Sequence, residues 1–179
     1  MYNLPSSVKK LPPLSPTEIG EIERRYSIVF PRSLREMYSE FLPCGEYFPA
    51  WNDFSDANTM RIRQLLDAPL KGLTLEVFEN GFWLDSWGEK PSASAEISTR
   101  FGQIFAAAPK LIPVYSHRYL PYLPDESDPA VISVVQSDII YYGENLRSYL
   151  ENEFGDGKIN PDLSRYAEIP FWSEIIVSR

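Results

Sequence analysis

The sequence has few of the residues that build metal sites and covalent cross-links. Its 179 residues include one cysteine, Cys44, and one histidine, His117. A single cysteine cannot form an intrachain disulfide, and one cysteine with one histidine is too few for the spacing patterns of structural zinc sites. The segment around Asp156 and Asp162 lacks the regular oxygen ligands of a calcium loop. We therefore expect no disulfide, no metal and no cofactor.

Long apolar runs and nucleotide-binding motifs are also missing. No apolar run approaches the ~20 residues that cross a bilayer, and the first ten residues lack the apolar stretch of a secretory signal. We therefore expect a soluble, cytoplasmic protein that does not contact membranes. No G-x-G-x-x-G motif occurs, and Gly88-Glu89-Lys90-Pro91 lacks the glycine loop that holds phosphates.

Positive charge is scarce in the last third of the chain. The formal net charge is −8; residues 1–124 hold 14 acids and 13 bases, whereas residues 125–179 hold 11 acids and 4 bases. A negative field repels phosphate backbones and attracts basic partners. This charge distribution argues against direct nucleic-acid binding and favours a cationic protein partner. An acidic surface also serves solubility.

Large apolar side chains, by contrast, are plentiful. Hydrophobic residues make up 44% of the chain and aromatic residues 14%. This composition and length predict a single domain over residues 1–179 with its own core. Ser15-Pro16-Thr17-Glu18 predicts a capped helix start. A second helix is expected from Pro31 or Arg32 to Leu42, packed against the first as a helical hairpin.

The rest of the chain predicts a mixture of strands and helices. Asn80-Gly81 favours a tight β-hairpin between Leu73–Phe78 and Phe82–Trp87. A short helix over Met60–Leu66 and a longer one over Ala93–Ala108 are also expected. Further strands are predicted at Leu111–Tyr115 and at Ala130–Gln136, with a long loop between them that contains His117, Arg118 and Tyr119.

The segment Val131–Phe154 joins a buried-strand pattern to an amphipathic helix, because β-branched residues give way to apolar residues at helical spacing. Helices, then hairpins, then a helix do not alternate as a parallel sheet requires. The fold class is therefore α+β, with a mainly antiparallel sheet packed against the N-terminal helical hairpin and further helices.

This segment resembles the SUKH superfamily, which includes the yeast Smi/Knr-type cell-wall assembly regulators and bacterial proteins that neutralise toxins. The resemblance extends to L-P-P-L-S-P-T-E-I at Leu11–Ile19, to Phe30–Leu42 and to F-E-N-G-F-W-L-D-S-W-G at Phe78–Gly88. It differs where many members have an Asn-Gly-Gly type turn, because this chain has Pro43, Cys44 and Gly45. The resemblance implies an α+β fold and a protein-binding function.

Catalytic constellations are weak in this sequence. His117 alone could act as a general base near neutral pH, but no G-x-S-x-G elbow accompanies it and no motif places Cys44 beside it. Paired carboxylates such as Glu79 and Asp85 have no defined separation. We therefore assign no catalytic residue, and a small hydrolase that uses His117 is the third of three functional hypotheses.

A protein-binding surface is the leading interpretation, because Trp, Tyr and Arg dominate protein interfaces. Its candidate residues are Trp51, Trp83, Trp87, Arg118, Tyr119, Gln136, Asp138, Tyr141 and Tyr142. Alternation along strands places about half of such rings in the core, and Asp138 also suits a turn cap. The first hypothesis is an immunity protein that neutralises a basic toxin, and the second is an intracellular regulatory scaffold.

Overall fold

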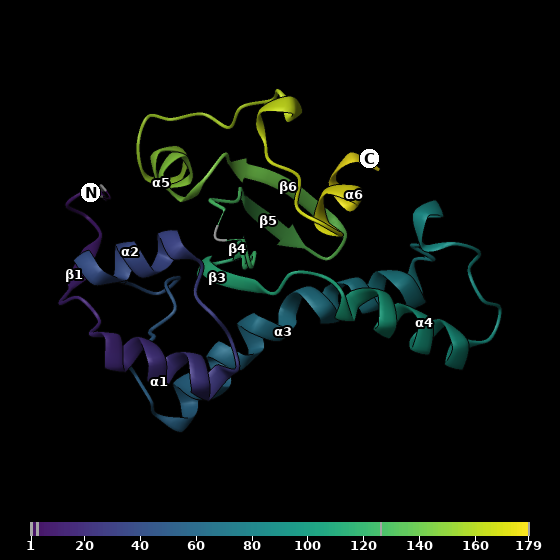
Figure 1. Ribbon diagram of the computed structural model, residues 1–179, viewed down its shortest axis with the longest axis horizontal. Coiled ribbons are helices and arrows are strands. Elements are labelled where there is room, and N and C mark those ends of the chain that lie inside the picture. Colours follow the sequence, from purple (N-terminus) through teal and green to yellow (C-terminus); the bar gives the residue numbers. More distant parts are fainter. Residues whose placement is uncertain (1, 3, 126, 179) are drawn as a thin grey trace.

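The computed structural model describes residue 2, residues 4–125 and residues 127–178. Within these residues the fold is α+β, as expected, with six α-helices and two antiparallel sheets packed together (Figure 1). The helices are α1 (Pro16–Tyr26), α2 (Arg32–Glu40), α3 (Asp56–Glu79), α4 (Ser94–Ala106), α5 (Leu146–Phe154) and α6 (Trp172–Val177). None of these helices is long and apolar enough to cross a membrane.

The larger sheet is a four-stranded antiparallel meander in which sequence neighbours pair in the order β3-β4-β5-β6. The strands are β3 (Leu111–Tyr115), β4 (Arg118–Pro121), β5 (Val131–Val135) and β6 (Asp138–Gly143). The prediction of a long loop from His117 onwards was wrong at its start, because Ser116 and His117 form a tight turn and β4 follows at once. Ser116 adopts a positive φ of 51°, which allows that turn.

The smaller sheet lies at the N-terminal side and pairs β1 (Lys9–Leu11) with β2 (Leu42–Cys44). Pro43 and Cys44 therefore lie in a short strand that follows α2 rather than in a turn. The predicted start of α1 is confirmed, since the Ser15 and Glu18 side chains form a reciprocal capping box.

The predicted hairpin around Asn80-Gly81 is wrong. Leu73–Phe78 belongs to α3, a 24-residue helix that begins after the N-cap Ser55 and also absorbs the predicted short helix. Asn80 is its C-cap and Gly81 has a φ of 73°, so the pair ends a helix instead of reversing a strand. The same tolerance of positive φ serves both purposes. Phe82–Trp87 contains a 3-10 turn, η1 (Asp85–Trp87), and no strand.

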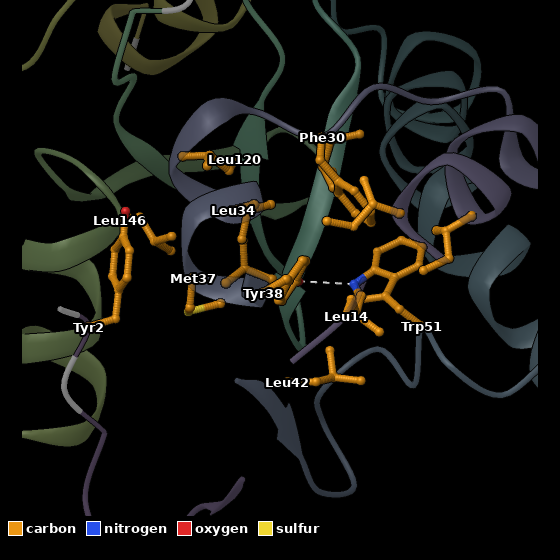
Figure 2. Close-up of a cluster of buried hydrophobic side chains, with 14 of the residues drawn as sticks. Tyr2, Leu14, Phe30, Leu34, Met37, Tyr38, Leu42, Trp51, Leu120 and Leu146 are labelled. Carbon is orange, nitrogen blue, oxygen red and sulfur yellow. Dashed lines mark hydrogen bonds between the residues drawn. The ribbon is translucent and has the colours of Figure 1, made fainter. Parts of the chain in front are cut away.

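The larger sheet separates two hydrophobic cores. One face, with Ile112, Leu120 and Val131, packs against α1, α2 and α5. Figure 2 shows this first core, where the Trp51 indole Nε1 donates a hydrogen bond of 3.0 Å to the Tyr38 hydroxyl. The opposite face packs against the second half of α3, α4 and α6, and its core is aromatic-rich. The predicted return of residues 169–176 to the core is confirmed.

Helix α3 meets the larger sheet at two points near its middle. Pro69 has no N–H to donate to the Leu65 carbonyl one turn earlier, and the buried Tyr119 hydroxyl of β4 donates to that carbonyl instead, at 3.0 Å. Further along, a Cβ at Gly72 would lie 3.0 Å from the Gln136 Cα in the β5–β6 turn. The missing side chain therefore lets the helix and the turn touch.

Candidate partner-binding site

The strand register divides the predicted partner-binding residues between the two faces of the larger sheet. Tyr119 lies opposite Ile132, and Ile132 lies opposite Tyr141. Arg118 lies opposite Ser133, and Ser133 lies opposite Ile140. Directly opposite residues project to the same face, and successive residues of a strand project to opposite faces. Arg118 and Tyr142 therefore share one face, whereas Tyr119 and Tyr141 share the other.

Four of the predicted surface residues are core residues instead. Trp51, Trp87, Tyr119 and Tyr141 are all buried. Trp51 is surrounded edge-on by Tyr26 and Phe30, so its single hydrogen-bonding group and its ring are both satisfied inside the first core. These rings were included because large aromatic residues suit interfaces, but the same area gives a large free-energy gain in a core.

The remaining tryptophans belong to the neighbourhood of the second core. Trp87 stacks on Phe171 with ring centroids 5.8 Å apart. Trp83 is half-buried, packs edge-on against Trp87 and donates from Nε1 to the Gly88 carbonyl at 2.8 Å. The structure therefore places Trp83 and Trp87 together at the second core. Arg118 lies on the other face of the sheet, so neither tryptophan shares a surface with it.

A surface patch does form on the other face, at the end of the sheet that carries the Ser116-His117 and Gln136-Ser137 turns. We call it the sheet-end patch: Val135, Asp138 and Ile140 are exposed, Arg118 and Tyr142 are half-buried, and the buried Ser133 contacts Arg118. Val135 is 47% exposed and Ile140 is 42% exposed. Both are β-branched and lie on paired strands, so the apolar surface that they show to solvent is held rigidly.

An ion pair fixes the edge of the sheet-end patch. Arg118 Nε lies 3.5 Å from Glu153 Oε2 of α5, and these side chains are only 12% and 17% exposed. The guanidinium also lies 4.0 Å from the Tyr142 ring centroid and 3.5 Å from Ser133 Oγ. Neither Arg118 Nε nor Glu153 Oε2 has a hydrogen-bond partner among the described residues. The pair is therefore desolvated but under-satisfied, which makes it sensitive to its surroundings.

A group of aromatic rings continues this surface beyond the ion pair. Tyr115 of β3 packs edge-on against Tyr47, Phe48 and Phe154, with ring centroids 4.7–5.6 Å apart. The Tyr47 side chain is 51% exposed, and its carbonyl accepts from the Ser116 N–H at 2.8 Å. Burial and the nearby Glu153 carboxylate raise the pKa of Tyr115, so its hydroxyl stays protonated and can donate a hydrogen bond.

His117 lies in the tight turn next to the patch, and its hydrogen bonds define its tautomer. Its Nε2 contacts the Arg118 guanidinium, which has only donors, so Nε2 accepts. The ring proton of the neutral imidazole then lies on Nδ1 and is donated to Ser116 Oγ, 3.1 Å away. Burial and the Arg118 charge lower the pKa of His117. In this arrangement Nδ1 cannot take a proton from Ser116, as a general base would.

Gln136 and Asp138 flank the β5–β6 turn. Gln136 adopts a positive φ of 55°, and its backbone rests against Gly72 of α3. Ser137 between them donates to Glu76 Oε2 at 3.2 Å, and Glu76 also accepts from the Asn80 side chain at 3.0 Å. Gln136 is therefore a turn residue that sets the hairpin against α3, whereas Asp138 is exposed on the same face as Ile140.

Sequence reasoning missed Tyr47, Tyr115, Val135, Ile140 and Glu153. The alternation of Ile139 and Ile140 on one strand was the available signal, because only one of two successive residues can enter the same core. Nothing in the sequence predicts that Glu153 reaches Arg118, since this contact depends on how α5 packs over the sheet. No group of three or more metal-ligating side chains occurs within the described residues.

Comparisons with known proteins add no assignment. No family model, no curated protein and no solved structure matches this chain. The functional argument therefore depends on the geometry of the sheet-end patch and on the sequence pattern.

Proposed function

We propose that this chain is a SUKH-type immunity protein that binds a basic toxin domain through the sheet-end patch and carries out no chemistry of its own. The observation that carries the proposal is the pair Val135 and Ile140, which expose apolar area on a rigid strand pair beside the desolvated Arg118–Glu153 ion pair. Interface anchors of this kind combine apolar area with arginine and tyrosine at a preorganised surface.

Charge favours a basic partner. The last third of the chain, which supplies most of the patch, contains 11 acids and 4 bases. Exposed carboxylates occur within the patch, at Asp138, and beside the neighbouring aromatic rings, at Glu46 next to Tyr47 and at Glu151 one turn before Phe154. The long-range field would accelerate the approach of a cationic domain, while the apolar and aromatic anchors would slow its dissociation.

The geometry at His117 supports a binding role over a hydrolytic one. A nucleophile–base pair needs a base nitrogen that accepts the nucleophile's proton, whereas the Arg118 contact directs the Nδ1 proton of His117 towards Ser116. The depressed pKa of His117 also has an ordinary cause in burial beside a guanidinium. We therefore keep the interpretation of a binding module.

The test is co-purification of the tagged protein from its own host at low salt, with Ile140→Arg as the test variant. Ile140→Arg adds charge and bulk at the centre of the patch, while Met60→Arg makes the same change at an exposed site on α3. We expect one stoichiometric partner of high pI that is retained by wild type and Met60→Arg and lost by Ile140→Arg. Co-expression of wild type, but not of Ile140→Arg, should relieve the toxicity of that partner.

Two results would contradict the proposal. Retention of the partner by Ile140→Arg, with unchanged thermal stability of the variant, would remove the sheet-end patch from the interface. Capture of several unrelated, non-toxic proteins would instead identify a regulatory scaffold.

A further inference from the structure

A cavity of about 530 Å³ lies on a different part of the molecule from the sheet-end patch. The end of α1 with the two residues after it, the middle of α3, the stretch from the end of α4 to the start of β3, and one residue of α6 form its walls. Figure 1 shows α1 and α3 below the larger sheet, with α3 running on towards α4. Pockets that hold small organic molecules have volumes in this range, and none of the sequence-predicted site residues lines this one.

The floor of the cavity is mainly apolar. It is formed by side chains that are buried in the two cores, namely Tyr26, Ile28, Leu111 and Trp172. The Trp172 Nε1 already donates to the Pro109 carbonyl at 3.0 Å. The indole therefore needs no hydrogen bond from a ligand and offers only carbon surface. Leu66 and Phe105 add half-buried apolar walls.

The rim of the cavity is cationic, in a protein whose net charge is −8. Arg25, Arg63 and Lys110 line it, and Asp67 is the one carboxylate among the lining residues. Asp67 lies 3.5 Å from Lys71, which is outside the lining, so its charge is partly neutralised. A mouth with this excess of positive charge favours an anion over a cation or a neutral molecule.

The three cations differ in how fully their donors are used. Lys110 Nζ donates one hydrogen bond of 2.7 Å to the Ser27 carbonyl and so is held over the mouth. Arg25 lies 3.6 Å from the Glu21 carboxylate and packs on the Phe54 ring. Arg63 is exposed and makes no hydrogen bond or ion pair within the part of the chain that the structure describes. Its planar guanidinium is free to bind a carboxylate through two parallel hydrogen bonds.

We propose that this cavity binds an amphipathic organic monoanion, a carboxylate with an aromatic or similarly compact apolar body. The apolar body lies against the edge-on pair of Phe105 and Trp172, whose ring centroids are 5.8 Å apart. The carboxylate lies at the rim, where it accepts hydrogen bonds from Arg63 and Lys110. The site favours a ligand with both properties, because the buried lining offers mainly carbon surface, with the unpaired Tyr26 hydroxyl as an exception, and the cationic donors lie at the rim. It is independent of toxin binding and is tested separately.

The experiment is isothermal titration calorimetry of the full chain with 2-naphthoate, and with the neutral amide 2-naphthamide as a matched ligand. We expect saturable one-to-one binding of 2-naphthoate and binding of the amide that is weaker by about tenfold, the loss expected for one charge-assisted contact. Arg63→Glu should weaken 2-naphthoate binding by at least about tenfold. Lys158→Glu makes the same charge reversal outside the cavity lining and should leave the affinity unchanged.

A second variant tests the location without changing charge. Ala106 lines the cavity and is exposed, so Ala106→Trp fills the mouth without disturbing the core. It should abolish binding while its thermal unfolding stays at the wild-type temperature. The proposal is overturned if 2-naphthoate shows no saturable binding at millimolar concentration, if the amide binds equally well, or if either Arg63→Glu or folded Ala106→Trp binds like wild type.

Discussion

The two faces of the larger sheet are built from adjacent residues of the same strands, yet they differ in what covers them near the β5–β6 turn. On one face, Tyr119, Ile132 and Tyr141 lie side by side across the strands and are buried under α3 and α6. On the other face, Arg118, Ser133 and Ile140 lie side by side in the same way, and Ile140 is exposed. The difference shows that aromatic or branched character alone does not identify an interface. Exposure depends instead on the face of the strand and on whether a helix reaches that far along it.

The largest effect should come from removing one side chain from each face of β6. Ile139 is fully buried and Ile140 is 42% exposed. We expect Ile139→Ala to lower the free energy of unfolding by about 2–5 kcal/mol, because it leaves a cavity in the second core. Ile140→Ala should cost less than about 1 kcal/mol. Urea unfolding of both variants measures the difference, and equal losses would mean that both faces of β6 are covered.

A smaller effect is expected from the ion pair at the edge of the patch. Glu153→Gln leaves the desolvated Arg118 guanidinium without its counter-charge and should cost about 1–3 kcal/mol. The matched control is Asp67→Asn, which breaks a pair with the same 3.5 Å separation whose side chains are more than half exposed. The control should cost less than about 0.5 kcal/mol. If chemical denaturation gives the same loss for both, burial does not strengthen the Arg118–Glu153 pair.

The hydroxyl of Tyr119 offers a third test, on the covered face. Tyr119→Phe leaves the Leu65 carbonyl unpaired opposite Pro69 and should cost about 1 kcal/mol, whereas Tyr142→Phe on the open face should cost less than about 0.5 kcal/mol. Pro69→Ala restores an N–H that can bond Leu65. In the Pro69→Ala background the cost of Tyr119→Phe should therefore fall. An undiminished cost in this double-mutant cycle would show that the hydroxyl stabilises the protein in some other way.

The smallest expected effect is a pH dependence at the turn beside the open face. The folded-state pKa of His117 lies below its ordinary value because of burial and the Arg118 charge. The unfolded state therefore binds a proton first as the pH falls, and stability should decrease below about pH 6.5. Thermal unfolding between pH 7.5 and about pH 5.5 should show a steeper loss for wild type than for His117→Asn. Parallel curves would mean that His117 titrates alike in both states.

Much of the fold could be predicted from local patterns. The capping box at Ser15, the helix α4 and the order of extended segment and helix from Val131 to Phe154 all depend on contacts within a few residues. The turn that divides this extended segment into β5 and β6 was not predicted. The hairpin at Asn80-Gly81 could not be distinguished from a helix end, because a glycine with positive φ, as at Gly81, suits both. Strand β4 was missed because four residues with a proline acquire strand geometry only from their neighbours in the sheet.

The candidate site was predictable only in part, for a related reason. Arg118, Asp138 and Tyr142 were chosen for their chemistry and do lie on one face, but Tyr119 and Tyr141 were chosen by the same rule and lie on the other. The two-residue period of a strand predicts that Arg118 and Tyr119 project to opposite faces, and likewise Tyr141 and Tyr142. It does not tell which face α5 leaves open, or that Glu153 lies against Arg118, since those facts depend on the length and docking of a helix.

The contact between Gly72 and the β5–β6 turn sets how closely helix α3 can lie to the sheet. A methyl group at position 72 would lie 3.0 Å from the Gln136 Cα, so the turn would have to retreat by a few tenths of an ångström. At this contact, the approach of α3 to the hairpin that carries Val135 and Ile140 therefore depends on the absence of a side chain at position 72. Gly72→Ala would therefore displace the β5–β6 hairpin relative to α3 without changing any residue of the sheet-end patch.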